Sequence, residues 1–371
     1  MAVTKPATRT CYLHIGTPKA GSTTIQGFLH VYRDALQATG LDLPTFEQED
    51  IFAGGVRISK SLEREKNPSV PKSQAWKWLD GHLAETDGDL CISREAFLAI
   101  FTEKKNITFV RRFFAERGVR LKMIAYVRDT AGFYNANYTQ QAKRFLTELD
   151  FDGWAEKMMG SPLLIHRNAR LFRNVLAQEE VEVVVRPLQN LGPKGLIGDF
   201  CEQIGRPDFD WSGFDEKPFR NETPGARTMA AALVVARKLR EGVEAGKLAD
   251  LGLYRELGRQ FRELTATRGW AEKPFYGPTP EMAKRIEDRF AKSNERLAQR
   301  VWGSSWLENV RPSTKERCVY DIEAAPPAER AEIEDVTNEF IYGLIKNVDE
   351  RRAVLNAPGI RKPGRISAEF P

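Results

Sequence analysis

The amino-acid sequence predicts an α/β protein, in which helices flank a parallel β-sheet and further helices are added toward the C-terminus. Up to about residue 205, short apolar runs alternate with segments of helical periodicity. Such alternation is typical of strand–helix–strand units in a parallel sheet. Beyond about residue 225 only helical patterns occur. A glycine-bounded turn between the first strand and the first helix indicates where a ligand would bind.

Four apolar runs are expected to form the buried strands. Each is short and rich in Val, Ile, Leu or Tyr, as strands covered on both faces should be. The runs are Cys11–Ile15, Asp89–Ser93, Leu121–Val127 and Val181–Arg186.

Segments of helical periodicity lie between and after these runs. Those of the α/β part are Ser22–Leu36, Ser73–Thr86, Ile107–Gly118, Phe133–Leu146 and Pro162–Gln178. Those that follow are Ala226–Glu244, Leu251–Thr267, Pro280–Trp302 and Ala328–Asn347. We therefore expect one domain over residues 1–371, with an α/β core at about 10–205 and helical additions at about 225–350. The tail 357–371 is expected to be extended or disordered.

Composition narrows the function classes. A net charge of +5 over 371 residues is too weak to favour nucleic acid as a partner. The four cysteines form no CxxC pair and the four histidines show no metal-ligand spacing, so neither a disulfide framework nor a metal site is expected. The sequence shows no signal peptide and no run of about 18 apolar residues, which favours a soluble, cytoplasmic protein.

The most specific pattern is HIGTPKAGSTT at residues 14–24, where the first strand meets the first helix. Gly16 and Gly21 supply backbone conformations that other residues avoid. Such a turn directs backbone N–H groups and the positive end of the helix dipole at one point, which suits an anion. The spacing differs from a Walker A motif, because Lys19 precedes the second glycine and Ser22 follows it.

The segment TPKAGSTTIQ resembles the loop that binds the 5′-phosphosulfate in bacterial sulfotransferases that use 3′-phosphoadenosine-5′-phosphosulfate (PAPS). The resemblance implies a P-loop-type sheet and transfer of a sulfuryl group, with 3′-phosphoadenosine-5′-phosphate (PAP) as product. It implies that Lys19 acts catalytically at the bridging oxygen, while loop amides and hydroxyls hold the 5′-phosphate. The implied contacts are Thr17, Pro18, Lys19, Ala20, Gly21, Ser22, Thr23 and Thr24.

A second anchor is expected where the third strand ends in YVRD. An arginine at a strand end faces the crevice in which open α/β sheets bind ligands, and its planar fork suits a phosphate. By resemblance, Arg128 contacts the 3′-phosphate. The family places a serine eight residues later, where this chain has Ala136. Asn137 is the neighbouring donor, although it lies about 100° further round the helix.

The general base is expected at the end of the second strand, which reads Ser-Arg-Glu. Bacterial relatives often carry Ser-x-Glu here, so Glu95 is the candidate base. The alternative is that Glu95 caps the following helix or pairs with Arg94. His30 and the carboxylates of Glu47–Asp50 are other candidates.

Weaker resemblance extends over residues 10–305, through stretches that contain Arg186, Asn221 and residues 289–303. The bacterial resemblance favours a small-molecule or glycan acceptor, such as a carbohydrate or glycolipid, with a hydroxyl or amine that receives the sulfuryl group. Two alternatives stay open: a nucleoside or small-molecule kinase with a phosphate loop, and a non-catalytic relative that binds a nucleotide or glycan.

Overall fold

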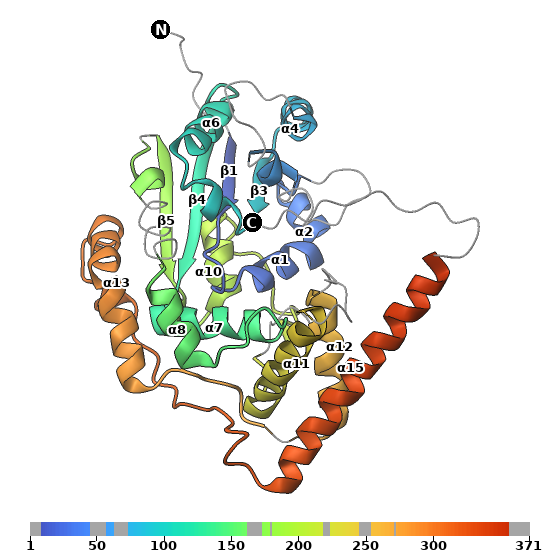
Figure 1. The fold of residues 1–371 in the computed structure, drawn as a ribbon. Coiled ribbons are helices and arrows are strands. Elements are labelled where there is room, and N and C mark those ends of the chain that lie inside the picture. Colours follow the sequence, from blue (N-terminus) through green and yellow to red (C-terminus); the bar gives the residue numbers. More distant parts are fainter. Residues whose placement is uncertain are drawn as a thin grey trace. The chain divides into compact units, whose positions relative to one another are not determined.

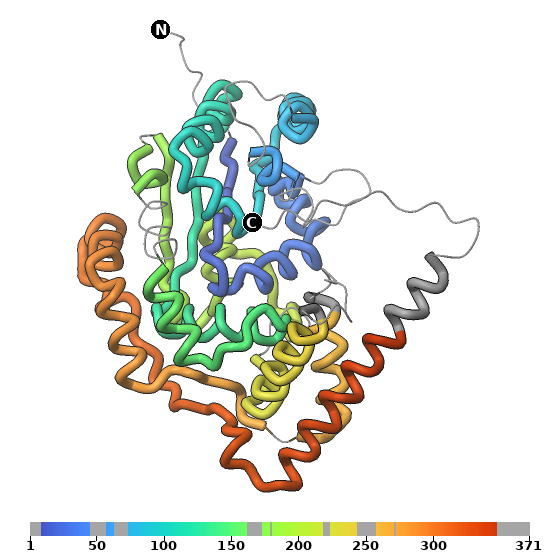
Figure 2. Tube along the Cα trace, in the orientation of Figure 1, coloured from blue at the N-terminus to red at the C-terminus, as the bar shows by residue number. Residues whose placement is uncertain are grey.

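A computed structural model describes residues 9–44, 57–62, 73–161, 173–178, 180–217, 223–244, 254–270 and 272–355 (Figure 2). The chain divides into two compact units. The first comprises residues 1–133, 159–221 and 284–313, and the second comprises residues 134–158, 222–283 and 314–371. The sequence-based expectation of a single domain stays a prediction.

The first unit contains a five-stranded sheet in the order β2-β3-β1-β4-β5 (Figure 1). All four strand pairs are parallel. The strands are β1 (Arg9–His14), β2 (Leu41–Asp42), β3 (Asp89–Ser93), β4 (Val119–Val127) and β5 (Val181–Pro187). The α/β class predicted from the sequence is therefore confirmed, and the parallel order places the carboxyl ends of β1, β3 and β4 at one edge of the sheet.

Helices cover both faces of this sheet. On one face, α1 (Ser22–Val31) and α10 (Gly195–Gln203) pack with Tyr12 and Tyr126 through residues such as Phe28 and Phe200. On the other face, α4 (Gln74–Glu85) and α6 (Lys104–Ala115) pack with Leu13. Adjacent residues of β1 thus enter opposite cores, which is the period-two alternation of a strand.

Further helices complete the chain. They are α2 (Arg33–Ala38), α5 (Phe97–Ile100), α7 (Thr130–Ala142), α8 (Phe151–Met159), the 3₁₀ turn η1 (Leu188–Asn190), α11 (Ala226–Glu244), α12 (Tyr254–Thr267), α13 (Pro280–Val301), α14 (Trp306–Asn309) and α15 (Pro327–Leu355). In the second unit, α11, α12 and α15 share a hydrophobic core that includes Val235, Phe261 and Phe340.

Several predicted boundaries need correction. The two-residue β2 was not predicted, because it is too short to show a pattern. The helix expected at Ser22–Leu36 is two helices, interrupted at Tyr32, whose φ and ψ of −102° and 20° leave the helical range. The helix expected from Phe133 begins earlier, at Thr130, soon after β4 ends at Val127. The helix α8 was not predicted. The limits of α11 agree with the prediction.

Some expectations fall on residues that are not described. These are most of the helix predicted at 162–178, the tail at 357–371, the candidate carboxylates Glu47–Asp50, and Asn221. None of the described helices is both long enough and apolar enough to cross a bilayer.

Candidate functional site

The loop between β1 and α1 is fixed to the neighbouring strand β4. The backbone N–H of Thr17 donates to the carbonyl of Tyr126 at 2.9 Å, and the N–H of Tyr126 donates to the carbonyl of Gly16 at 2.6 Å. Gly16 and Gly21 have φ of 98° and 87°, a region that favours glycine, as the sequence predicted. These contacts extend the β1–β4 ladder into the loop and hold its backbone in place.

Two loop hydroxyls are directed inward. The Thr17 hydroxyl donates to the Tyr126 carbonyl at 2.8 Å, and the Ser22 hydroxyl faces the Thr17 carbonyl at 3.4 Å. Both side chains are buried, whereas Thr23 is exposed. The hydroxyls of Thr17 and Ser22 therefore support the loop. The N–H groups of Thr17 and Ala20, both predicted as contacts, also donate within the protein, to the carbonyls of Tyr126 and Thr17.

The N-terminus of α1 has free donor capacity. In the described part of the chain, the N–H groups of Gly21, Ser22, Thr23 and Thr24 donate no hydrogen bond, and the first intrahelical bond runs from Ile25 to Gly21. The first turn of α1 contains no acidic side chain. A helix N-terminus with unsatisfied amides and no carboxylate favours an anion.

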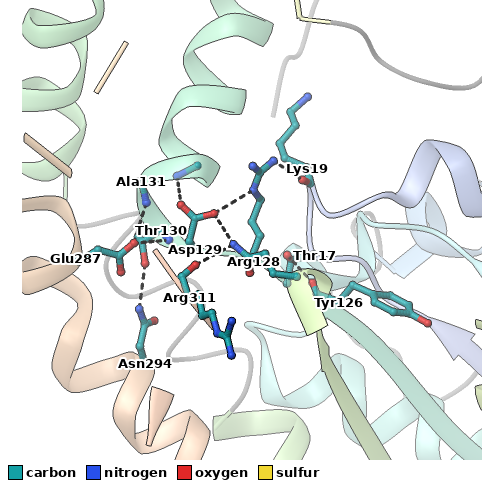
Figure 3. A network of polar contacts seen from close by, with 12 residues as sticks. Thr17, Lys19, Tyr126, Arg128, Asp129, Thr130, Ala131, Glu287, Asn294 and Arg311 are labelled. Atoms are coloured by element: carbon teal, nitrogen blue, oxygen red, sulfur yellow. Dashed lines mark hydrogen bonds and ion pairs between the residues drawn. The ribbon is translucent and has the colours of Figure 1, made fainter. Parts of the chain in front are cut away.

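Arg128 joins this loop from the end of β4 (Figure 3). Its Nη1 donates to the carbonyl oxygen of Lys19 at 3.3 Å, and its Nε lies 3.8 Å from Asp129 Oδ2. The side chain of Lys19 extends away from this network, while its carbonyl faces Arg128 (Figure 3). The structure thus brings together the loop and Arg128, which the sequence predicted as two anchors of one ligand.

The N-terminus of α7 is occupied by carboxylates of the protein itself. Glu287 Oε1, from α13, accepts hydrogen bonds from the N–H groups of Thr130 at 2.8 Å and Ala131 at 3.0 Å. Asp129 Oδ1 accepts from Gly132 N–H at 2.6 Å. Burial raises the pKa of Glu287, against the lowering effect of these hydrogen bonds. An anion near Arg128 therefore cannot use the N–H groups of Thr130, Ala131 and Gly132, which already donate to carboxylates.

Glu95 lies at the rim of the loop. A Cβ built on Gly16 would lie 3.2 Å from the Cβ of Glu95. Its Oε2 accepts a hydrogen bond from Gln26 Nε2 on α1 at 3.0 Å, and its Oε1 lies 3.8 Å from Arg94 Nη1. The structure therefore places the candidate base beside the loop, and the ion pair with Arg94 that the sequence left open is also present.

His14 is completely buried beneath the loop at the end of β1. Its Nδ1 lies 2.7 Å from Ser93 Oγ, and its ring contacts Tyr126 and Phe200 edge-on. Burial lowers the pKa of His14 to about 4, although the nearby Glu95 opposes this shift. The imidazole is therefore neutral near pH 7 and serves to hold Ser93.

Other predicted residues have different surroundings. Arg186 donates through two nitrogens to Asp199 Oδ2, at 2.8 and 2.5 Å, and Tyr126 donates to the other oxygen of this buried carboxylate. This network supports the packing of α10. Ala136 and Asn137 are half-buried on α7 and belong to the second unit, whereas the loop belongs to the first. The ligand contact of Asn137 therefore stays a prediction.

Sequence reasoning missed three residues of the site. Gln26 was missed although it lies four positions after Ser22, and so on the same face of α1. Glu287 and Asn294 reach α7 from α13, where Asn294 Nδ2 donates to Thr130 Oγ1 at 3.0 Å. Asn294 belongs to the stretch 289–303 that resembles the family, but nothing in that pattern indicates which residue it contacts.

The described residues contain no group of three or more His, Cys, Asp or Glu side chains arranged to hold a metal ion. Comparisons with protein-family models, with curated proteins and with solved structures find no match to this chain.

Proposed function

We propose that the protein is a sulfotransferase, which moves a sulfuryl group from PAPS to a hydroxyl or amine, with a carbohydrate or glycolipid as acceptor. The observation that carries the proposal is the N-terminus of α1, where the N–H groups of residues 21–24 have no acceptor among the described residues. These amides follow Lys19, whose carbonyl accepts a hydrogen bond from Arg128. This arrangement provides donors for two separate phosphates of one nucleotide. The similarity of TPKAGSTTIQ to the phosphosulfate loop selects PAPS from among nucleotide substrates.

In the proposed reaction, Glu95 and Lys19 have separate roles. Glu95 accepts the proton of the attacking hydroxyl or amine while the acceptor atom forms its bond to sulfur. The bond between sulfur and the bridging oxygen breaks, and the electron pair stays on the 5′-phosphate of PAP. Lys19 and the α1 amides stabilise the negative charge that develops there.

A thermal-shift comparison of PAP, PAPS, ADP and ATP with magnesium tests the proposal. PAP should raise the free energy of unfolding by about 2.7 kcal/mol when its concentration is near a hundred times its Kd, by mass action. ATP with magnesium should stabilise the protein much less. An equal or larger effect of ATP would instead favour the kinase alternative.

A turnover assay separates the transferase from a non-catalytic binder. Protein that binds PAP is incubated with ³⁵S-labelled PAPS and a panel of glycans, and transfer of label to a glycan is measured. Tight binding of PAP without transfer to any acceptor would favour the non-catalytic alternative.

A further inference from the structure

Arg94 lies beside the loop between β1 and α1, at the end of β3. Its backbone N–H donates to the carbonyl of His14, the last residue of β1, at 2.9 Å. The residue that follows it, Glu95, lies against Gly16. The Arg94 side chain is 29% exposed. Arg94 thus belongs to the rim of the site, next to the candidate base.

The guanidinium of Arg94 has no hydrogen-bond partner in the described part of the chain. Its Nη1 lies 3.8 Å from Glu95 Oε1, a distance too long for a hydrogen bond. Its Nε is enclosed by protein and donates to no group. Glu95 directs its other oxygen to Gln26. Only the Nε is enclosed, while the side chain as a whole is 29% exposed, so the terminal nitrogens of this five-donor group can reach a ligand.

Three arginines of similar exposure that lie away from the loop each have a carboxylate within hydrogen-bond distance. Arg117, Arg186 and Arg317 have side chains that are 22%, 35% and 31% exposed. Each donates to a carboxylate, at 2.5 Å to Asp80, 2.5 Å to Asp199 and 2.8 Å to Asp152, respectively. Arg128, whose side chain is 27% exposed, resembles Arg94: its nearest carboxylate oxygen lies 3.8 Å away and its Nε donates to no described group. The two arginines beside the loop between β1 and α1 thus keep donors open toward a ligand.

We infer that Arg94 binds an oxyanion group of the acceptor, and that the acceptor is therefore acidic, bearing a carboxylate, phosphate or sulfate. This inference rests on the proposed function. The donor nucleotide's phosphates are assigned to the α1 amides and to Arg128, so the cation beside Glu95 faces the acceptor. The planar fork of a guanidinium matches two oxygens of one such group. Binding there would hold a hydroxyl or amine of the same molecule near Glu95.

The test follows the side-chain Nε–H signal of Arg94 by NMR in protein saturated with PAP and labelled with ¹⁵N-arginine. The signal is assigned from the Arg94→Lys variant, in which it disappears. Glucuronate should shift the signal in a saturable way, and inorganic phosphate should shift the same signal. Glucose, which has hydroxyls but no charge, should leave it unchanged. Arg94→Gln should bind glucuronate at least tenfold more weakly.

Arg112→Gln is the matched control, because Arg112 is an exposed arginine of α6 that pairs with Glu116. It should bind glucuronate as the parent does. Equal weakening by both variants would show a general effect of charge and overturn the inference. An Arg94 signal that responds to neither anion would overturn it too. A signal that moves between PAP and PAPS but not with glucuronate would assign Arg94 to the donor's sulfuryl group instead.

Different results would contradict the proposed function and the role of Arg94. Absence of PAP binding would contradict the proposed function, and the titration of free protein with glucuronate would then decide the role of Arg94 by itself. The melting temperature of Arg94→Gln shows whether it is folded. If this variant does not fold, the titration of the parent protein still decides the outcome.

Discussion

At the scale of single residues, the backbone and the side chain of Lys19 have different surroundings. Lys19 has a φ of 67°, which is unusual for a residue with a side chain. Its carbonyl contacts Arg128, so its backbone holds the loop while its ammonium group is directed elsewhere. The structural role of the Lys19 backbone and the catalytic role proposed for its ammonium group can therefore be tested by different substitutions.

Lys19→Asn should lower turnover on the order of a hundredfold or more, because it removes the cation at the leaving oxygen. Asparagine adopts positive φ more readily than most residues, so the loop should keep its conformation. Binding of PAP should weaken much less than turnover falls. Steady-state kinetics and calorimetry measure the two effects. Near-normal turnover would remove Lys19 from the proposed chemistry.

Gln26→Glu should move the acidic limb of the pH–rate profile to higher pH. The substitution sets a second carboxylate where an amide now lies 3.0 Å from Glu95 Oε2, and two close carboxylates raise the pKa of one another. An unchanged acidic limb in Gln26→Glu would show that a group other than Glu95 titrates there.

Glu95→Gln should lower turnover by roughly a hundredfold to ten-thousandfold and abolish the acidic limb of the pH–rate profile.

At the scale of secondary-structure elements, two helices begin at the same edge of the sheet but differ at their N-termini. The first turn of α1 keeps open amides, whereas Glu287 and Asp129 occupy those of α7. Both helices follow a parallel strand, so topology alone would offer two anion sites. The carboxylate from α13 removes one of them.

Glu287→Gln should change how stability depends on pH. Since burial raises the pKa of Glu287 in the folded protein above its ordinary value of 4.5, the folded state binds this proton more tightly than the unfolded state does. The parent should therefore gain free energy of unfolding, relative to Glu287→Gln, as the pH falls through the raised pKa toward 4.5. Urea unfolding of both proteins at pH 7, 6 and 5 measures the difference. A constant difference would contradict the shift.

At the scale of the whole molecule, the chain divides into two compact units. The first contains the sheet, the loop between β1 and α1, Glu95 and Arg128, and the second contains the core shared by α11, α12 and α15. A ligand that binds the loop should stabilise the first unit against local opening, because local unfolding free energies follow local contacts.

Hydrogen exchange should report this division. PAP is expected to slow amide exchange in residues 16–24 and around Arg128, and to leave α11, α12 and α15 unchanged. Exchange in α7 beyond Tyr134 tests the predicted contact of Asn137. The measurement is mass spectrometry of peptides with and without PAP. Equal protection of both units would contradict a site built from the first unit.

The sequence by itself determined the α/β class, the positions of four strands and the loop conformation at Gly16 and Gly21. These features follow from patterns among neighbouring residues: apolar runs, helical periodicity and glycines where φ is positive. The sequence also placed Arg128 and Glu95 at one edge of the sheet, because both follow strands whose carboxyl ends must meet there. Their roles stay predictions, and that of Glu95 rests in part on the Ser-x-Glu resemblance.

Only the tertiary structure decided which groups face one another at that edge. The contacts of Gln26 with Glu95 and of Glu287 with Thr130 join residues 69 and 157 positions apart. The two-residue β2 forms by pairing with β3, which no local pattern reveals. Hydrogen bonding and burial depend on all neighbours in space, and these also leave the donors of Arg94 open and make the His14 imidazole neutral.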